Sequence, residues 1–488
     1  MHHTETDYLV IGAGATGLAF ADTLISETRA HVTLLDRRGK PGGHWNDAYP
    51  FVTLHQPSAF YGVASMELGS GLKDPVGLNQ GMAELASGPE VCGYFDRVMN
   101  HRLLTTGRVN FQPLSNYVGP VGDPSQGLHE FESLLSGERT MVRVHKKVVD
   151  ATFFSPHIPA THPPAFAVAD GVRVLPPNAL PGLWQLAQQG PMPRRFVVVG
   201  AGKTAMDTCI WLLRSGTPAH AITWVMPRDS WVMNRLGTQN GAEFFKEALG
   251  GQADQLQAFA EASSIDDLYL RLEACGAMFR IDRTRMPTMF HLATLSEAEV
   301  EVLRQIHNVV RLGRVQAIHA DGMQLEQGRV AVEPGALYIN CTASAVHFKR
   351  PKAVFQGQRI TVQLLRSPHV TFSASLTAWV EAHVEDEAQQ NRLCTPVPFP
   401  RTLADYPRMM AVNMSNQFLW GQDATLRQWI RHNRLDAFGR LAGEVDKADT
   451  EKQAILVRLK TQAQAAATNL PQLMAAGAGD TAGCTPIG

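Results

Sequence analysis

The chain has 488 residues, enough for two or three domains, and its 44 basic and 45 acidic side chains leave a net charge of −1. This balance gives no field for nucleic acid or an anionic membrane surface, so we expect a small-molecule partner. No apolar run reaches the ~20 residues needed to cross a bilayer, and the six scattered cysteines contain no C-x-x-C pair. The first strand is expected to begin almost at Met1, without a signal peptide. We therefore expect a cytoplasmic protein with reduced thiols and no metal site.

The first predicted unit is a strand, a glycine-rich loop and a helix. Tyr8–Ile11 predicts the strand, and Gly12-Ala13-Gly14-Ala15-Thr16-Gly17 follows it. In such a loop the first glycine makes a tight turn, the second lets a diphosphate approach the backbone, and the third packs the helix against the strand. The N-terminus of the helix then presents free N–H groups to phosphates. The unit is therefore expected to bind a dinucleotide.

Asp36 ends the next predicted strand, His31–Leu35, and lies 19 residues after Gly17. A carboxylate at this place can accept hydrogen bonds from an adenosine ribose. The alternative is an ordinary surface carboxylate after a strand. The glycine-rich loop that precedes Asp36 favours the ribose.

The sequence after Asp36 predicts a helix over 82–99, a strand over 109–111 and a hairpin that pairs 131–135 with 141–144. Residues 148–152 are expected to return to the first sheet. The segment 157–194 is rich in proline, which predicts a connection between domains.

A second glycine-rich loop, Gly200-Ala201-Gly202-Lys203-Thr204-Ala205, follows the apolar strand Phe196–Val199 and opens an apolar helix. The second strand of this unit is predicted at Ala221–Val225. Two such loops on one chain indicate two dinucleotides, one that holds electrons and one that delivers them.

The rest of the chain predicts a helical insertion that shapes a substrate pocket, meander strands over 309–340, and a largely helical C-terminal part. The fold class is therefore α/β, with two Rossmann-like dinucleotide-binding domains, each a three-layer sheet with a meander. The predicted division is 1–155 for the first part of the FAD-binding domain, 156–195 for the connection, 196–345 for the NADPH-binding domain with its insertion at 237–307, 346–467 for completion of the FAD domain and the helical region, and 468–488 for a disordered tail.

Gly42-Gly43-His44-Trp45 follows Asp36 and precedes Tyr49-Pro50. The glycines allow the backbone to pass close to a flat or charged group, and Trp45 offers an indole face for stacking. The alternative is a tight turn with a core tryptophan.

Together these motifs resemble the FAD-binding half of the class B flavoprotein monooxygenases, a group that includes flavin-containing monooxygenases, Baeyer–Villiger monooxygenases and amine N-hydroxylases. The second glycine-rich loop and the stretch 224–232 resemble the NADPH half of the same group. The resemblance covers about residues 5–350. It implies that NADPH reduces FAD, that the reduced flavin and O₂ form a C4a-(hydro)peroxide shielded by NADP⁺, and that a small organic substrate is then oxygenated.

The resemblance also implies roles for single residues. Arg228 is expected to bind the 2′-phosphate of NADPH through a charge-assisted fork, unless it is a solvated loop arginine. The acid Asp229 comes only after Pro227-Arg228, which favours NADPH over NADH. The other cofactor-binding residues implied are Gly12, Gly14, Gly17, Asp36, Arg37, Gly43 and Trp45 for FAD, and Gly200, Gly202, Lys203 and Thr204 for NADPH.

Two further predictions concern chemistry at the flavin. His55 and Gln56 lie where the loop after Trp45 returns, and this histidine can donate a hydrogen bond or accept a substrate proton. The alternative is a satisfied loop histidine and amide. Ser373 is expected to open a helix over 378–384 whose N-terminus faces the flavin, the alternative being an ordinary N-cap.

The sequence also departs from the family pattern. The Baeyer–Villiger fingerprint before the second loop is absent, and the acid expected shortly after Tyr49-Pro50 is His55. Phe153 replaces the glycine of the usual Ala-Thr-Gly crossing, at Ala151-Thr152-Phe153.

These departures favour heteroatom oxygenation or N-hydroxylation over Baeyer–Villiger oxidation. Two alternatives remain: a flavoprotein reductase or dehydrogenase that does not activate O₂, and a degenerate flavoprotein that binds nucleotide as a sensor or scaffold.

Overall fold

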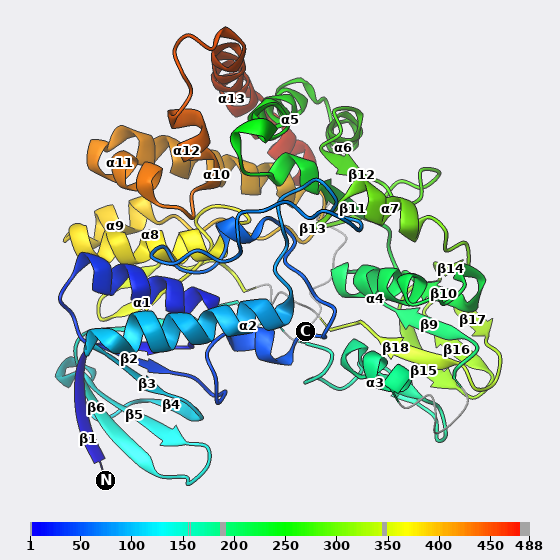
Figure 1. Cartoon of the computed structure of the whole chain (residues 1–488), viewed down its shortest axis with the longest axis horizontal. Helices are drawn as coiled ribbons and strands as arrows, with labels where there is room; N and C mark the ends of the chain where they lie inside the picture. Colours follow the sequence, from blue (N-terminus) through cyan, green and yellow to red (C-terminus); the bar gives the residue numbers. More distant parts are fainter. Residues whose placement is uncertain (1, 155, 157, 186–191, 344–348, 479–488) are drawn as a thin grey trace.

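The first sheet of the structure has parallel central strands, with helices against it (Figure 1). The structure is a computed structural model that describes residues 2–154, 156, 158–185, 192–343 and 349–478. The sheet runs β19 (Phe355–Gln356), β20 (Arg359–Thr361), β6 (Arg139–Asp150), β1 (His2–Ile11), β2 (Val32–Leu35) and β3 (Val109–Gln112), with β4 (Ser115–Pro120) and β5 (Leu128–Ser133) forming a meander beside β6. Residues 355–361 thus complete a sheet that begins at the N-terminus.

Helices α1 (Ala15–Glu27) and α8 (Val370–His383) pack against one another in the first unit. Both are largely buried, and their apolar side chains join those of β1 and β2 in one core cluster. Thr23 on α1 and Ser375 on α8 share a buried hydrogen bond of 2.7 Å. This pairing holds α1, and the loop before it, against the sheet.

The second sheet contains five parallel strands in the order β14 (Val309–Val310), β10 (Ile222–Val225), β9 (Phe196–Val199), β18 (Leu337–Asn340) and β8 (Val174–Leu175). Helix α4 (Lys203–Arg214) follows β9. A separate sheet of β15 (Val315–His319), β16 (Gly322–Leu325), β17 (Gly328–Ala331) and β7 (Ala167–Val168) packs beside it, and α3 spans Leu180–Gln185. The predicted two Rossmann-like units are confirmed.

A third unit combines a small sheet with long helices. The sheet is formed by β11 (Ser230–Asn234), β12 (Met278–Phe279) and β13 (Met289–Leu295), and the helices are α5 (Gly251–Glu261), α6 (Ile265–Ala274), α10 (Asp405–Gln422) and α13 (Thr450–Ala478). The short helix α7 (Glu297–Leu303) follows β13 and packs on the second unit. Trp231, Tyr269, Phe290 and Tyr406 form its aromatic centre. The range 237–307, expected to be helical, therefore also contributes two strands to this sheet.

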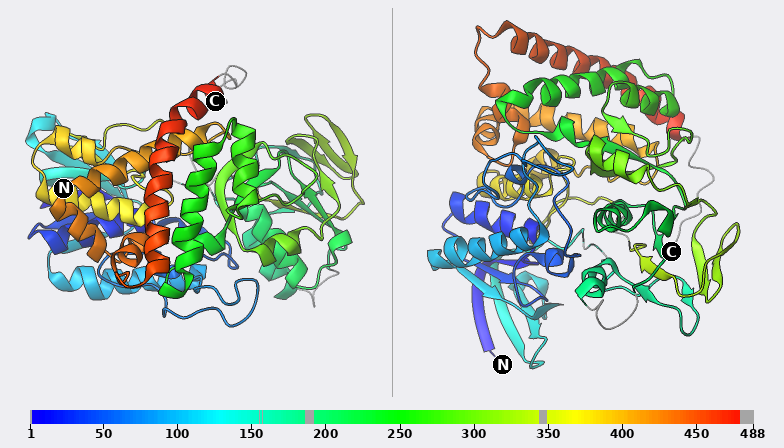
Figure 2. Two further views of the ribbon diagram at one scale, coloured as in Figure 1. Left: turned by 90° about the horizontal axis from the view of Figure 1, so that it is seen from above. Right: turned by 45° about the vertical axis from the view of Figure 1, so that its right-hand side comes forward.

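The predicted disorder from residue 468 is wrong as far as residue 478, because α13 continues to Ala478 and lies along α5 (Figure 2). Alanine has the highest helix propensity, and Ala466, Leu470 and Leu473 are buried in the aromatic unit. The segment therefore has an apolar face and a partner for it. Residues 479–488 of the predicted tail lie outside the described residues.

Helix boundaries also differ from the predictions. Helix α2 spans Gly88–Arg97 and starts six residues later than predicted, because Ser87 and Glu90 form a capping box in front of it. The remaining helices near the C-terminus are α9 (Glu387–Leu393), α11 (Ala424–His432) and α12 (Ala437–Gly443). Among the described helices, none is both long and apolar enough to span a membrane.

Candidate active site between two nucleotide-binding loops

The first nucleotide-binding loop, Gly12–Gly17, packs so tightly that side chains would clash. Gly12 has φ of +99°, and a Cβ on Gly17 would lie 1.8 Å from the carbonyl oxygen of Gly12. A Cβ on Gly43 would lie 2.9 Å from the Cα of Gly14, so the Gly42-Gly43 turn touches the loop. Three backbone segments therefore meet here, and each approach requires glycine.

The N-terminus of α1 is open to a ligand. Gly14 is its N-cap, and no side chain caps the first turn. Uncapped N–H groups at a helix N-terminus, together with the helix dipole, form an anion site. Helix α4 has the same construction, with Gly202 as an N-cap and no side-chain cap. A Cβ on Gly202 would meet no atom within 4 Å, so there is free space in front of the second loop.

Asp36 lies at the end of β2 and stabilises the first loop through hydrogen bonds to its backbone. Its Oδ2 accepts a hydrogen bond of 2.7 Å from the backbone of Ala13, and its Oδ1 accepts one of 2.8 Å from the backbone of Arg38. Burial raises the pKa of Asp36, and these two hydrogen bonds act in the opposite direction. Each carboxylate oxygen keeps a second lone pair, so the residue can also accept from a ribose. Arg37 is exposed beside it.

Trp45 is held next to the Gly42-Gly43 turn. Its indole N–H donates to Tyr61 Oη at 2.8 Å, and its ring stacks on His44 with ring centres 5.4 Å apart. Burial lowers the pKa of His44 to about 4, so this imidazole is neutral at pH 7. The indole is partly exposed. It can therefore meet a ligand.

The two strands after the loops end differently. Val225 pairs with Val199 as Leu35 pairs with Ile11, so Met226 stands where the first unit has Asp36. Met226 is 2% exposed and has no carboxylate to offer a ribose. The second unit therefore lacks the acid that typically selects a free 2′-hydroxyl.

Arg228 follows Met226 and is exposed. The acid next to it, Asp229, is engaged by a bidentate ion pair in which Arg311 donates at 2.8 and 3.0 Å. Arg311 also donates to Asp282 at 3.0 Å. Because Asp229 is neutralised by Arg311, it repels a phosphate near Arg228 less than a free carboxylate would.

Lys203, the first residue of α4, turns its side chain toward its own helix. It forms an ion pair with Asp207, one turn later, and only 9% of its side chain is exposed. Asp207 also accepts a hydrogen bond of 2.6 Å from Tyr49 Oη, which belongs to the first unit. The second loop is thus tied to the first unit through Asp207. Thr204 lies in the same turn of α4 and is partly exposed.

The segment after Trp45 packs on the second unit. Phe51 stacks on Trp211 of α4 with ring centres 4.9 Å apart. Burial, together with the positive charges of Lys203 and Arg235, lowers the pKa of His55 to about 3. His55 is therefore neutral at pH 7 and can donate one hydrogen bond and accept one. Gln56 follows it and is partly exposed.

Ser373 does not occupy the predicted position. Helix α8 begins at Val370, so Ser373 lies inside the helix. Its hydroxyl donates to the carbonyl of His369 at 2.7 Å and accepts from the backbone N–H groups of Leu365 and Arg366 at 3.0 and 3.2 Å. The donor and both acceptor positions are used, so Ser373 holds the loop before α8 and has none left for a flavin. The expected helix start is wrong because partners far along the chain fix the loop before α8: Asn413 Oδ1 accepts a hydrogen bond from the backbone of Ser367, and Asn416 donates one to the carbonyl of Leu365.

Comparisons with known proteins agree with this architecture. A family model described as an NAD(P)-binding Rossmann-like domain matches residues 10–59. The "Uncharacterized protein Rv2000" of Mycobacterium tuberculosis (strain ATCC 25618 / H37Rv) and the "Uncharacterized protein Mb2023" of Mycobacterium bovis are each 41% identical over 477 residues, which cover 98% of this chain and 86% of theirs. The chain belongs to the same family as these two proteins.

Among solved structures, a cyclohexanone-bound cyclohexanone monooxygenase in its Rotated conformation superposes with a TM-score of 0.50. The sequence identity is 15%, and the match covers 80% of this chain and 92% of that one. The chain therefore has the fold of that enzyme. The resemblance to class B flavoprotein monooxygenases is confirmed at the level of the fold.

Sequence patterns did not mark Arg235, although the structure places it beside His55. Arg235 is fully buried and donates to the carbonyl of His55 at 3.0 Å and to the side chain of Asn79 at 3.2 Å. It also forms an ion pair of 2.7 Å with Glu299 on α7. Arg235 therefore positions the His55 segment. An arginine after a short strand carries no signal for this role, since its partners lie up to 180 residues away.

Proposed function

We propose that the protein is an FAD- and NADPH-dependent monooxygenase that transfers one oxygen atom from O₂ to a small organic substrate. The observation that carries the proposal is the presence, on one chain, of two glycine-rich loops that each lead to an uncapped helix N-terminus. The fold shared with an enzyme named cyclohexanone monooxygenase supports it.

The residues of the first unit fit FAD. The free N–H groups after Gly14 would hold the diphosphate, and Asp36 would accept from the ribose. Arg37 is exposed beside that ribose position, and Trp45 would lie against the ring. Bound FAD would supply hydride acceptance and the activation of O₂, which no amino-acid side chain provides.

The residues of the second unit fit NADPH. The open space at Gly202 would take the diphosphate, with Thr204 close to it. Met226 in place of an acid and the exposed Arg228 favour a 2′-phosphate over a free 2′-hydroxyl. The ion pair between Lys203 and Asp207 indicates that the backbone of the loop, more than the lysine side chain, would contact the diphosphate.

The polypeptide would contribute orientation and exclusion of water. Arg434 donates to the carbonyl groups of Ala59, Tyr61 and Val63, and so pins the segment after His55 against the C-terminal helices. A neutral His55 would offer a hydrogen bond to substrate or cofactor without adding charge. Gln56 would serve as a neighbouring polar contact.

We favour heteroatom oxygenation or N-hydroxylation over Baeyer–Villiger oxidation. The position that carries an acid in Baeyer–Villiger enzymes is His55 here, and its lowered pKa keeps it uncharged. A negative charge at that place is therefore missing from this chain. The overall reaction would consume one NADPH, one proton and one O₂, and yield oxygenated substrate, NADP⁺ and water.

The test begins with the purified protein loaded with FAD. Anaerobic addition of NADPH should remove the visible absorbance of the flavin. Isotopically labelled O₂ with a panel of amines, sulfides and ketones should then place one labelled atom in a product. Reduction by NADPH followed by electron transfer to a quinone, with no labelled product, would identify a reductase instead. Failure to bind FAD would refute both.

A further inference from the structure

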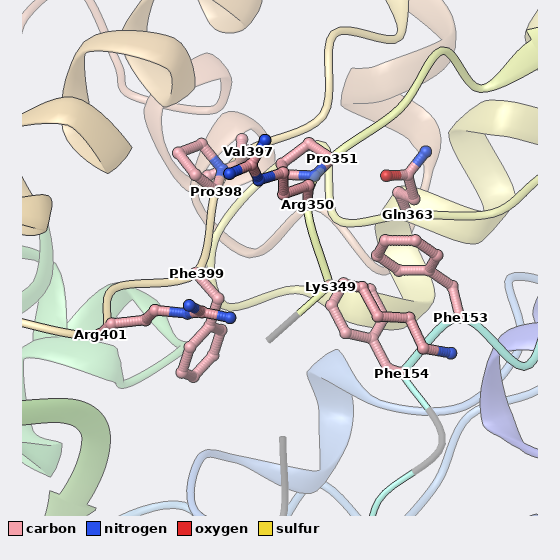
Figure 3. A pocket seen from close by; sticks show the side chains of 10 residues that line it. All are labelled: Phe153, Phe154, Lys349, Arg350, Pro351, Gln363, Val397, Pro398, Phe399 and Arg401. Atoms are coloured by element: carbon pink, nitrogen blue, oxygen red, sulfur yellow. The ribbon is translucent and has the colours of Figure 1, made fainter. Parts of the chain in front are cut away.

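A hollow with an empty volume of about 660 Å³, partly open to solvent, lies where four connecting segments meet (Figure 3). One segment follows β6, the second leads toward β19, the third follows β20, and the fourth follows α9. The residues that line the hollow are Phe153, Phe154, Lys349, Arg350, Pro351, Gln363, Val397, Pro398, Phe399 and Arg401. The hollow is therefore built from segments that the function proposed above leaves without a role.

The charged side chains of the lining are all cationic. Lys349, Arg350 and Arg401 come from two different segments, and no acid is among the lining residues. Lys349 and Arg350 are exposed, and neither forms an ion pair with an acid in the described parts of the chain. Three like charges around one concave surface create a local potential that attracts an anion.

The remaining wall is aromatic and apolar. Phe153 and Phe154 meet edge to face with ring centres 5.3 Å apart, and Lys349 Nζ lies 5.5 Å from the centre of the Phe153 ring. Phe399 stands across from them, beside Arg401 (Figure 3). Rings of this kind contact a flat apolar body, which an inorganic phosphate does not have. The lining thus combines an anion site with a surface for an aromatic ring.

The hollow adjoins the proposed flavin site. A Cβ on Gly12 would lie 3.0 Å from the methyl group of Thr152, and Phe153 is the next residue. The wall of the hollow therefore begins one residue from the first nucleotide-binding loop. This position accounts for Phe153, which replaces the small residue of the family pattern.

The framework of the hollow is held by hydrogen bonds. The side chain of Gln363 accepts from the backbone of Lys352 at 3.1 Å and donates to its carbonyl at 2.7 Å. The backbone N–H of Val397 donates to the carbonyl of Leu364 at 2.6 Å. These bonds join the second, third and fourth segments, so the lining residues are preorganised.

We propose that this hollow is the substrate site and that it takes a small planar organic anion, an aromatic carboxylate. The ring would lie against Phe153 and Phe154, and the carboxylate would face Lys349, Arg350 and Arg401. This inference rests on the proposed function, because only an active oxygenase would make the bound anion a substrate. The binding of the anion itself is measurable without any turnover.

The test measures binding to the FAD-loaded protein by calorimetry. Benzoate and 2-naphthoate serve as probes, and benzamide and 2-naphthamide are their neutral counterparts. The acids should bind and the amides should bind at least about tenfold more weakly, because a charge-assisted contact is lost. Equal binding of acid and amide, or no binding of either acid, would overturn the proposal.

Variants locate the site. Lys349→Met should weaken acid binding about tenfold, and Lys349→Arg should retain it. Lys352→Met is the matched control, because Lys352 is exposed nearby but does not line the hollow. The affinity of this variant for the acids should stay within about twofold of the wild-type affinity. If both methionine variants lose affinity for the acids equally, a diffuse electrostatic field causes the binding, and the assignment of the carboxylate site to Lys349 is overturned.

Two further measurements separate this proposal from the proposed function. The nucleotide fragment 2′,5′-ADP should bind equally well to wild type and Lys349→Met; if it loses affinity and competes with benzoate, the cations serve NADPH and the substrate assignment is wrong. Anaerobic bleaching by NADPH is measured on the wild-type protein. If bleaching fails in wild type while benzoate binds, the oxygenase proposal falls and the anion site stands.

Discussion

Substitution by alanine should disturb the fold at Gly17 but only the binding of NADPH at Gly202. In Gly17→Ala the new Cβ would lie 1.8 Å from the carbonyl oxygen of Gly12, and contacts below 3.0 Å do not occur in real structures. The loop or α1 must therefore move by more than about 1 Å. Overpacking of this kind costs about 1–3 kcal/mol, and the displaced loop puts at risk the 2.7 Å hydrogen bond between Gly12 and Leu35.

Gly202→Ala should leave the fold intact. Its Cβ meets no atom within 4 Å and its φ is −83°, so the only expected cost is less than about 1 kcal/mol for a poorer N-cap. The methyl group would, however, enter the space proposed for the diphosphate of NADPH. We expect the affinity of the Gly202→Ala variant for NADPH to fall about tenfold or more, with its FAD content unchanged.

The assays are thermal unfolding, bound FAD per chain from absorbance, and NADPH affinity from anaerobic titration. Gly17→Ala should lower the melting temperature and the FAD content together. If Gly17→Ala retains full FAD at the wild-type melting temperature, or if Gly202→Ala binds NADPH normally, the geometric argument for these loops is refuted.

Three other outcomes are expected. Arg228→Ala should reduce the preference for NADPH over NADH by about 1.5–3 kcal/mol, measured as the ratio of kcat/KM values, and an unchanged ratio would mean that another residue binds the 2′-phosphate. Tyr49→Phe removes the donor to Asp207 and should lower the free energy of unfolding in urea by about 1–3 kcal/mol, whereas no change would show that the link between the units is not stabilising. His369 is buried, and burial lowers its pKa in the folded protein to about 3. In the unfolded chain the pKa of the same histidine is about 6.5, so below pH 6.5 the unfolded state binds more protons than the folded state. Stability should therefore fall by up to about 1.4 kcal/mol per pH unit as pH drops from 6.5 toward 3, and His369→Phe should flatten this slope in pH-dependent unfolding; an unaltered slope would contradict the assignment.

The strands and turns of the two dinucleotide units were predictable because their signals are local. Phe196–Val199 forms β9 with the predicted bounds, since a short apolar run between turn residues forms a buried parallel strand. The glycines of both loops were found because a tight turn with positive φ at Gly12 and Gly200 limits the residue type at that position. Asp36 was singled out by its distance from the loop, and the structure places its carboxylate against the backbone of that loop.

The start of α8, the helicity of residues 468–478 and the strand β13 were not predictable in the same way. Each depends on a partner far along the chain. The loop before α8 is held by Asn413 and Asn416 of α10, α13 is stabilised by α5, and β13 pairs with β11. Local propensity is a weak guide where such packing decides the conformation.

By itself, therefore, the amino-acid sequence determined that two glycine-rich turns between strand and helix exist and which glycines build them, since backbone dihedral limits act within a few residues. Only the tertiary structure decided that Arg235 supports His55, that Asp207 links Tyr49 to Lys203, and that three cations surround the aromatic hollow. Hydrogen bonds and charge interactions act through space over a few ångströms, and the residues they join here come from segments that only folding brings together.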